Sequence, residues 1–168
     1  MQKESWGSIE GIVDVGPVIV AHCDNPCKDK MVEFIANIIS GERHALIPIS
    51  CFIGAYHILT RYLRVTRQDV VSALEKTLEI DSPAYHEEIS RSHAIQAIRS
   101  ASIYNIQGWD GYLLSLARTY GTRIIFTLDQ NLGKVEGFSA VLPLPESDIR
   151  KYHDWIAKQR KSQTLKNK

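Results

Sequence analysis

The sequence lacks any apolar run long enough to cross a membrane, and it contains only three cysteines. Cys23, Cys27 and Cys51 form an odd set, which argues against a disulfide framework and for reduced thiols. The first residues, Met-Gln-Lys-Glu-Ser-Trp, do not include the apolar core of a secretory signal. We therefore expect a cytoplasmic protein that does not enter a membrane.

The chain also lacks an excess of charge of either sign. It has 20 lysines and arginines against 19 aspartates and glutamates, which gives a formal net charge of +1. A dedicated, strongly basic nucleic-acid binder usually carries more positive charge. A near-neutral total still permits a nucleic-acid partner, because an acidic metal pocket can offset basic surfaces elsewhere. No Walker loop or dinucleotide fingerprint follows an expected strand.

The length and composition predict one folded domain. With 168 residues, 44% of them apolar, the chain can bury a sheet between helices but is short for two domains. We expect an N-terminal extension over residues 1–8, a domain over 9–145, and a C-terminal helix with a basic tail over 146–168. The tail from Lys158 onward is rich in lysine and arginine, and we expect it to be frayed.

Short apolar runs alternate with segments of helical spacing along the chain. The expected strands cover residues 9–14, 44–49, 123–128 and 139–143. The expected helices cover residues 17–22, 28–40, 51–63, 67–78, 82–103, 109–120 and 146–159, with starts marked by Pro17, Thr66 and Ser82-Pro83. Strands that alternate with helices predict a mostly parallel sheet with helices on both faces. The predicted fold class is therefore α/β, a three-layer α/β/α sandwich around a central parallel sheet.

Three aspartates lie beside the ends of expected strands. Asp14 ends the first strand, Asp129 ends the strand 123–128, and Asp110 opens the helix that leads to that strand. Ligands bind beyond the carboxyl ends of parallel strands, so we expect the three side chains to meet in one crevice. Carboxylate oxygens are preferred ligands of Mg²⁺ and Mn²⁺, and carboxylates held close together repel unless a cation or proton compensates them. The sequence therefore predicts a divalent metal site.

Each aspartate also has a purely structural interpretation. Asp110 can cap its helix, an interaction worth about 1 kcal/mol. Asp14 before Gly16-Pro17, and Asp129 before Gln130-Asn131, are both typical of turns. The joint placement of the three acids, rather than any one of them, favours the metal site.

Three segments resemble motifs of the PIN-domain family. The opening segment Asp14-Val-Gly-Pro-Val-Ile-Val-Ala21 is similar to the family's first motif, in which an Asp ends the first strand. Asp110-Gly-Tyr-Leu-Leu-Ser-Leu-Ala-Arg-Thr-Tyr-Gly121 resembles its third acidic motif, and Arg123-Ile-Ile-Phe-Thr-Leu-Asp129 resembles its last. The resemblance covers roughly residues 9–145, and the last two motifs together are its most specific part.

The resemblance implies a metal-dependent ribonuclease that hydrolyses RNA phosphodiester bonds with Mg²⁺ or Mn²⁺, as in RNA-processing enzymes and toxin–antitoxin nucleases. Asp14, Asp110 and Asp129 would be the catalytic metal ligands. Thr127 would orient an acid from the second shell, and Asn131 would lie near the pocket. The implied partners are RNA, a second copy of the chain and an antitoxin-like protein. The apolar helices 28–40 and 51–63 are equally suited to a dimer interface and to the core.

One departure from the family pattern concerns the helix after the second strand. The family usually places a Glu there, whereas this chain has Gly54, and no Asp or Glu occurs from Leu46 to Gln68. Three acids can still hold one hydrated Mg²⁺, since that ion keeps several waters. The alternative hypothesis is a catalytically weakened PIN domain that acts as an RNA- or protein-binding module. Close packing, a local kink and relaxed constraint are all open explanations for the glycine.

Another doubly wound phosphotransfer fold, such as a receiver or haloacid-dehalogenase-like domain, would also place an Asp after the first strand. The segment Asp14-Val-Gly lacks the second Asp of the dehalogenase motif. No Lys follows a late strand as in receivers. Both observations disfavour this class.

Arg61, Arg64 and Arg67 cluster between two expected helices. They are candidates for contact with nucleic-acid phosphates beside the acidic crevice. The competing interpretation is the favourable placement of cations near a helix carboxyl end.

Two other groups are weaker metal candidates. His22, Cys23 and Cys27 lie close together but lack a second ligand pair for zinc, so free thiols are the expected state. His86 and His93 are expected to be seven residues apart on one helix, where a solvated face is favoured over a surface metal.

Overall fold

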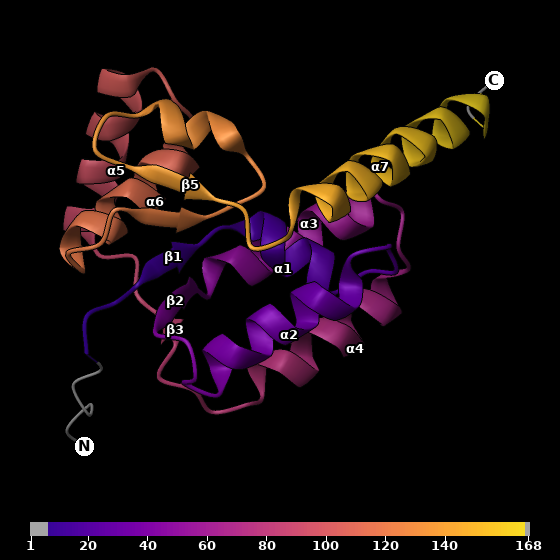
Figure 1. The fold of residues 1–168 in the computed structure, drawn as a ribbon, viewed down its shortest axis with the longest axis horizontal. Coiled ribbons are helices and arrows are strands. Elements are labelled where there is room, and N and C mark those ends of the chain that lie inside the picture. Colours follow the sequence, from indigo (N-terminus) through magenta and orange to yellow (C-terminus); the bar gives the residue numbers. More distant parts are fainter. Residues whose placement is uncertain (1–6, 167–168) are drawn as a thin grey trace.

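The sheet has five strands, and all of them run parallel. The computed structural model describes residues 7–166, and of residues 160 and 162–166 it describes only the backbone. The strands are β1 (Gly11–Val13), β2 (Ala45–Pro48), β3 (Tyr85–His86), β4 (Ile124–Phe126) and β5 (Ser139–Val141). They are arranged in the order β3-β2-β1-β4-β5, and Ile12 in the central strand pairs with Leu46 and Ile125 (Figure 1). The carboxyl ends of β1 and β4 are therefore neighbours.

Helices cover both faces of this sheet. The helices are α1 (Val15–Ala21), α2 (Lys28–Ile39), α3 (Ser50–Arg61), α4 (Arg67–Leu78), α5 (Arg91–Tyr104), α6 (Gly108–Thr119), the short 3₁₀ helix η1 (Gln130–Lys134) and α7 (Glu146–Lys166). Figure 1 shows α5 and α6 on one side of the sheet and α1 to α4 on the other.

Alternation along each strand builds two cores, one on each face. One core joins the helices α1 to α4 to the strand residues Val13, Ala45, Ile47 and Phe126. The other joins α5, α6 and η1 to the strand residues Ile12, Leu46 and Ile125. The predicted α/β/α sandwich with a parallel sheet is thus confirmed.

The first helix begins earlier than Pro17, the expected start. Asp14 has extended backbone (φ −81°, ψ 172°), and its carboxylate accepts a hydrogen bond from the Val15 amide, so the helix starts directly after β1. Pro17 then falls in the first turn, where its missing N–H costs no intrahelical bond. Asp14 is consequently placed at the junction of strand and helix.

The segment after α4 differs from its prediction. Ser82-Pro83 does not open a helix, because the buried Ser82 hydroxyl donates to the Ile39 carbonyl and accepts from the Ala84 amide. The chain then pairs with β2 as the edge strand β3. The helix starts only at Arg91, where the Ser90 hydroxyl accepts from the His93 amide as an N-cap.

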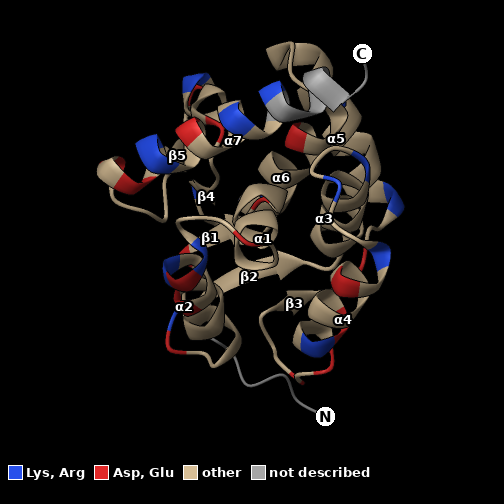
Figure 2. Cartoon of the chain, turned by 90° about the vertical axis from the view of Figure 1, so that its right-hand side faces the viewer, with Lys and Arg blue, Asp and Glu red and all other residues tan. Residues whose placement is uncertain are grey.

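The last helix was expected to end at residue 159, and this was wrong, because α7 continues to Lys166. Whether the tail from Lys158 frays stays a prediction. The helix is anchored at its start, where Ile149 is buried and Lys30 and Lys151 form ion pairs with Asp148. Figure 1 shows the remainder extending away from the sheet, and Figure 2 shows charges of both signs along it.

Two of the expected segments lie partly outside the described residues. Most of the expected extension 1–8 lies outside the described residues, and so does Lys168. Within residues 7–166, no helix has both the length and the apolar character that a membrane crossing requires.

Candidate metal and nucleic-acid site

Asp14 is the most buried of the three aspartates, with 7% of its surface exposed. Both of its carboxylate oxygens accept hydrogen bonds. Oδ1 accepts from the Val15 amide at 2.6 Å, and Oδ2 accepts from the Thr127 hydroxyl at 2.7 Å. The carboxylate is therefore held in one orientation at the carboxyl end of β1.

Thr127 connects two of the acids. Its fully buried hydroxyl donates to Asp14 and accepts a hydrogen bond from the Asp129 amide at 3.0 Å. Thr127 follows directly after β4, so its hydroxyl reaches both the Asp14 side chain at the end of β1 and the Asp129 backbone two residues further on. The hydrogen bond expected from Thr127 to an acid is present, while its role toward a metal stays a prediction.

Asp129 is exposed, and its Oδ1 accepts from the Asn131 amide at 2.9 Å, so it caps the 3₁₀ helix η1. The turn interpretation of Asp129 thus describes part of its role. Asn131 itself is exposed, and its side-chain oxygen accepts from Lys134 instead of lining the acidic pocket. Its contribution to the site is the backbone amide that positions Asp129.

Asp110 lies in the first turn of α6 and is half-buried. The residue at the N-cap position is Gln107, whose side chain makes no capping bond. Asp110 reaches back to the Gln107 backbone, and this hydrogen bond favours its charged form. The carboxylate therefore does help to cap the helix, but it also faces the other two acids.

The three aspartates line one cavity of about 850 Å³, which we call the acidic pocket. Its walls come from the ends of β1 and β4 and from the helices α3 and α6. Besides the acids, the lining residues are Val15, Ser50, Ile53, Gly54, His57, Ile58, Ile89, Gln107 and Trp109. The structure thus brings the three predicted site residues together, in a cavity whose other walls are largely apolar.

The acids influence one another electrostatically. Burial raises the pKa of Asp14, against the hydrogen bonds from Thr127 and Val15, and the charge of Asp129 raises it further. Burial also raises the pKa of Asp110, and the charges of Asp14 and Asp129 add to the effect. The pocket therefore concentrates negative charge that a cation or a proton would relieve.

The donor set fits a hard divalent cation, because it consists of carboxylate oxygens. Among residues 7–166, however, no group of three or more His, Cys, Asp or Glu side chains is arranged so that it could hold a metal ion. The three acids therefore share a pocket without forming a ready-made metal site in this conformation. An ion held here would keep several water ligands.

Gly54 lies on the α3 wall of the acidic pocket. A Cβ atom at this position would meet only the Val15 side chain within 4 Å, at 3.3 Å. Close backbone packing therefore does not demand glycine here. Ser50 and His57, one turn before and after Gly54, line the same wall, so a longer side chain at residue 54 would point toward the acids.

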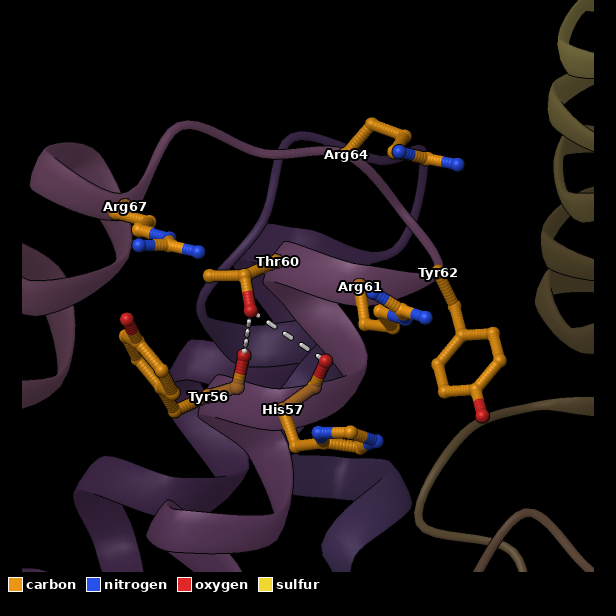
Figure 3. Close-up of a pocket in the computed structure, with 7 residues that line it drawn as sticks. All are labelled: Tyr56, His57, Thr60, Arg61, Tyr62, Arg64 and Arg67. Atoms are coloured by element: carbon orange, nitrogen blue, oxygen red, sulfur yellow. Dashed lines mark hydrogen bonds between the residues drawn. The ribbon is translucent and has the colours of Figure 1, made fainter. Parts of the chain in front are cut away.

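Arg61, Arg64 and Arg67 gather around a second cavity of about 600 Å³, which we call the arginine pocket. Its other lining residues are Tyr56, His57, Thr60 and Tyr62 (Figure 3). His57 lines both this cavity and the acidic pocket. Sequence reasoning missed His57, although its spacing of three residues from Gly54 on a helix would have placed it on the same face.

The weaker metal candidates have ordinary structural roles. Both ring nitrogens of His22 are hydrogen-bonded, to the Val18 carbonyl and to Thr77. Cys27 is buried and donates to the Asp148 carbonyl, and the described cysteines are all free thiols. The expectation that His86 lies on a helix with His93 was wrong, because the edge strand β3 contains His86; the two rings still meet, at 5.7 Å between centroids.

Comparison with models of known protein families gives no match for this chain, and no curated protein matches it either. The site consists of three aspartates in one pocket, a buried threonine that hydrogen-bonds to two of them, and a cluster of arginines beside that pocket.

Proposed function

We propose that the protein is a metal-dependent ribonuclease of PIN type. The observation that carries the proposal is the hydrogen bond from Thr127 to Asp14 at the edge of a pocket that Asp110 and Asp129 also line. Carboxylates that share one pocket repel one another, an arrangement that is costly as structure alone and suited to a cation. The motif resemblance at Asp14, Asp110 and Asp129 supports the same conclusion.

In this proposal, Asp14, Asp110 and Asp129 hold one hydrated Mg²⁺ or Mn²⁺ ion. When bound, such an ion supplies an activated water and stabilises charge on a phosphate during in-line attack. Thr127 keeps the Asp14 carboxylate in one orientation, and the Asn131 amide does the same for Asp129. Asp14 is the buried acid of the three, and its low hydration strengthens its electrostatic interactions.

The second candidate function is an RNA- or protein-binding module with weakened catalysis. It is favoured by Gly54, which leaves the α3 wall of the acidic pocket without a carboxylate. Fewer protein ligands would leave the metal more weakly held and the attacking water less well oriented. The two candidates differ in the rate of cleavage rather than in the location of the site.

The proposal includes partners that stay predictions. Most apolar residues of α2 and α3 lie in the core, and the exposed exceptions include Val32 and Ile53. A small apolar cavity between α3 and α4 includes Ile53, Val71 and Leu78 and offers a surface to a second copy or an antitoxin-like protein. The buried free thiols fit a cytoplasmic protein.

Cleavage of labelled RNA by the purified protein tests the proposal. We expect cleavage with Mn²⁺ and none after chelation, and we expect Asp14→Asn to reduce the rate at least about 100-fold. Asp81→Asn is the matched control, because Asp81 is exposed and precedes β3 at the opposite edge of the sheet. Equal rates for Asp14→Asn and Asp81→Asn would reject the metal-dependent mechanism.

A further inference from the structure

Among the side chains that the structure describes, the three arginines of the arginine pocket have no acidic ion-pair partner. The ion pairs within the described residues join Lys30 and Lys151 to Asp148, and Arg43 to Glu10. None of them includes a residue of the arginine pocket. The segment that contains the arginine pocket, from Leu46 to Gln68, contains no Asp or Glu. Three cations at one cavity without a carboxylate repel one another, and a bound polyanion would relieve that repulsion.

The helix dipole does not explain this cluster. Arg61 lies in the last turn of α3, where a cation is favourable. Arg64 lies beyond that helix, in the left-handed backbone region with φ of 59°. Arg67 is the first residue of α4, where the dipole disfavours a cation. The helix dipole therefore does not account for the positions of Arg64 and Arg67.

Aromatic rings accompany the arginines. His57 and Tyr62 meet edge to face, with 5.6 Å between their ring centroids, and 60% of the Tyr62 surface is exposed. Figure 3 shows His57, Arg61 and Tyr62 on one side of α3, with Arg67 reaching toward Thr60 from the start of α4. Cations with accessible rings are the combination that binds single-stranded nucleic acids, since the rings stack on bases and the cations contact the backbone.

The arginine pocket adjoins the acidic pocket at His57, which lines both cavities. A strand with one phosphate at the aspartates would therefore have its next nucleotides beside His57 and the arginines. Figure 2 shows basic residues at the end of α3 and in the connection to α4. The arginines thus lie on one side of the acidic pocket, so a polynucleotide bound at the aspartates would leave the pocket toward them.

We propose that the arginine pocket binds the single-stranded RNA segment adjacent to the phosphate held at the acidic pocket. The inference rests on the proposed function for the identity of the polynucleotide. Arg64 and Arg67 contact backbone phosphates, and Tyr62 stacks on a base. A duplex would keep its bases stacked inside, where Tyr62 does not reach them.

Fluorescence anisotropy with a labelled single-stranded 12-nucleotide RNA, in chelator, measures this binding without cleavage. We expect the double variant Arg64→Gln/Arg67→Gln to bind at least about 10-fold more weakly, and its slope of log affinity against log salt to decrease by about 1.4. The control is Arg99→Gln/Arg123→Gln, because both residues are exposed and lie on α5 and before β4. Affinities of the double variant equal to those of the control would overturn the proposal.

The contribution of stacking is tested at Tyr62. We expect Tyr62→Phe to retain the affinity and Tyr62→Leu to lower it about 5-fold or more, since only the phenyl ring stacks. A duplex RNA of the same length is expected to bind more weakly than the single strand. Duplex binding as tight as that of the single strand would overturn the assignment of substrate class.

Cleavage assays on the same variants separate this inference from the proposed function. Binding through the arginine pocket without cleavage in Mn²⁺ would uphold the RNA-binding pocket and reject the nuclease. Cleavage with a KM that Arg64→Gln/Arg67→Gln leaves unchanged would uphold the nuclease and reject the pocket. We expect cleavage, with a KM raised about 10-fold and a smaller change in kcat.

Discussion

The Thr127 hydroxyl donates a 2.7 Å hydrogen bond to Asp14 Oδ2, and both side chains are buried. The two residues are 113 positions apart in the chain, yet they lie at the ends of the adjacent strands β1 and β4. A carboxylate fixed in this way is already oriented before any ligand arrives. The pair therefore links the topology of the sheet to the chemistry proposed for the pocket.

Replacing Thr127 tests this orientation. We expect Thr127→Val to lower the cleavage rate and the Mn²⁺ affinity by about 10- to 100-fold, and to destabilise the protein by about 1–3 kcal/mol, because a buried carboxylate oxygen loses its partner. Thr127→Ser keeps the hydroxyl and should retain most activity. Titration with Mn²⁺ and thermal unfolding measure both effects, and equal loss in Val and Ser variants would show that the hydroxyl does not matter.

Adding a carboxylate at Gly54 tests whether the α3 wall limits the site. We expect Gly54→Glu to bind Mn²⁺ about 10-fold more tightly and to cleave RNA faster, because the side chain would extend from α3 toward the acids. Gly54→Ala is the control for the backbone. It should leave metal affinity unchanged and raise helix stability by less than about 1 kcal/mol, given the contact with Val15. An unchanged metal affinity in Gly54→Glu would show that the α3 wall does not limit the site. An absence of metal binding even in this variant would show that the acids are not a working site.

Because its pKa is raised, Asp110 is expected to lower the folding stability of the metal-free protein in a pH-dependent way. A carboxylate whose folded pKa lies above its unfolded value of 3.8 contributes most stability below that value, and this contribution is lost as the pH rises through the folded pKa. We therefore expect metal-free Asp110→Asn to melt about 2 °C or more above the wild type at pH 7. The difference should vanish at a pH below 3.8. A variant less stable than the wild type at pH 7 would contradict the repulsion among the acids.

The close approach of α5 and α6 depends on Gly111. A Cβ atom there would lie 2.2 Å from the Ala97 carbonyl oxygen, so Gly111→Ala must push the two helices apart. We expect a loss of about 1–3 kcal/mol in denaturant unfolding, and weaker Mn²⁺ binding because Asp110 precedes this residue. Gly108→Ala is the control, since a Cβ at Gly108 meets nothing within 4 Å.

Much of the architecture could be predicted from the pattern of apolar residues. Four of the five strands and most helices follow from short buried runs and from helical spacing, and Thr66 caps α4 as its sequence context suggests. The edge strand β3 could not be predicted, because it is two residues long and is formed by tertiary pairing and the Ser82 hydrogen bonds. Local sequence propensity indicates neither the pairing of β3 with β2 nor the hydrogen bonds of Ser82.

The site was predictable where it follows from topology. Asp14 and Asp129 share a pocket because the parallel strands β1 and β4 end side by side, and Asp110 joins them from the start of α6, the helix that leads to β4. Tyr62 was not identified, because its place beside the arginines depends on the direction of α3 rather than on strand order. His57 was missed although its helical spacing from Gly54 indicates the same face. Asn131 was assigned to the pocket from its position after Asp129, whereas its side chain points to Lys134.

The most direct test of the proposed function is anomalous scattering from crystals soaked in Mn²⁺. We predict one manganese peak between the carboxylates of Asp14, Asp110 and Asp129, with waters completing the coordination sphere. The peak should disappear in Asp14→Asn and persist in Asp81→Asn. A structure with Mn²⁺ bound only elsewhere, or with no peak at these three carboxylates, would contradict a metal-dependent nuclease.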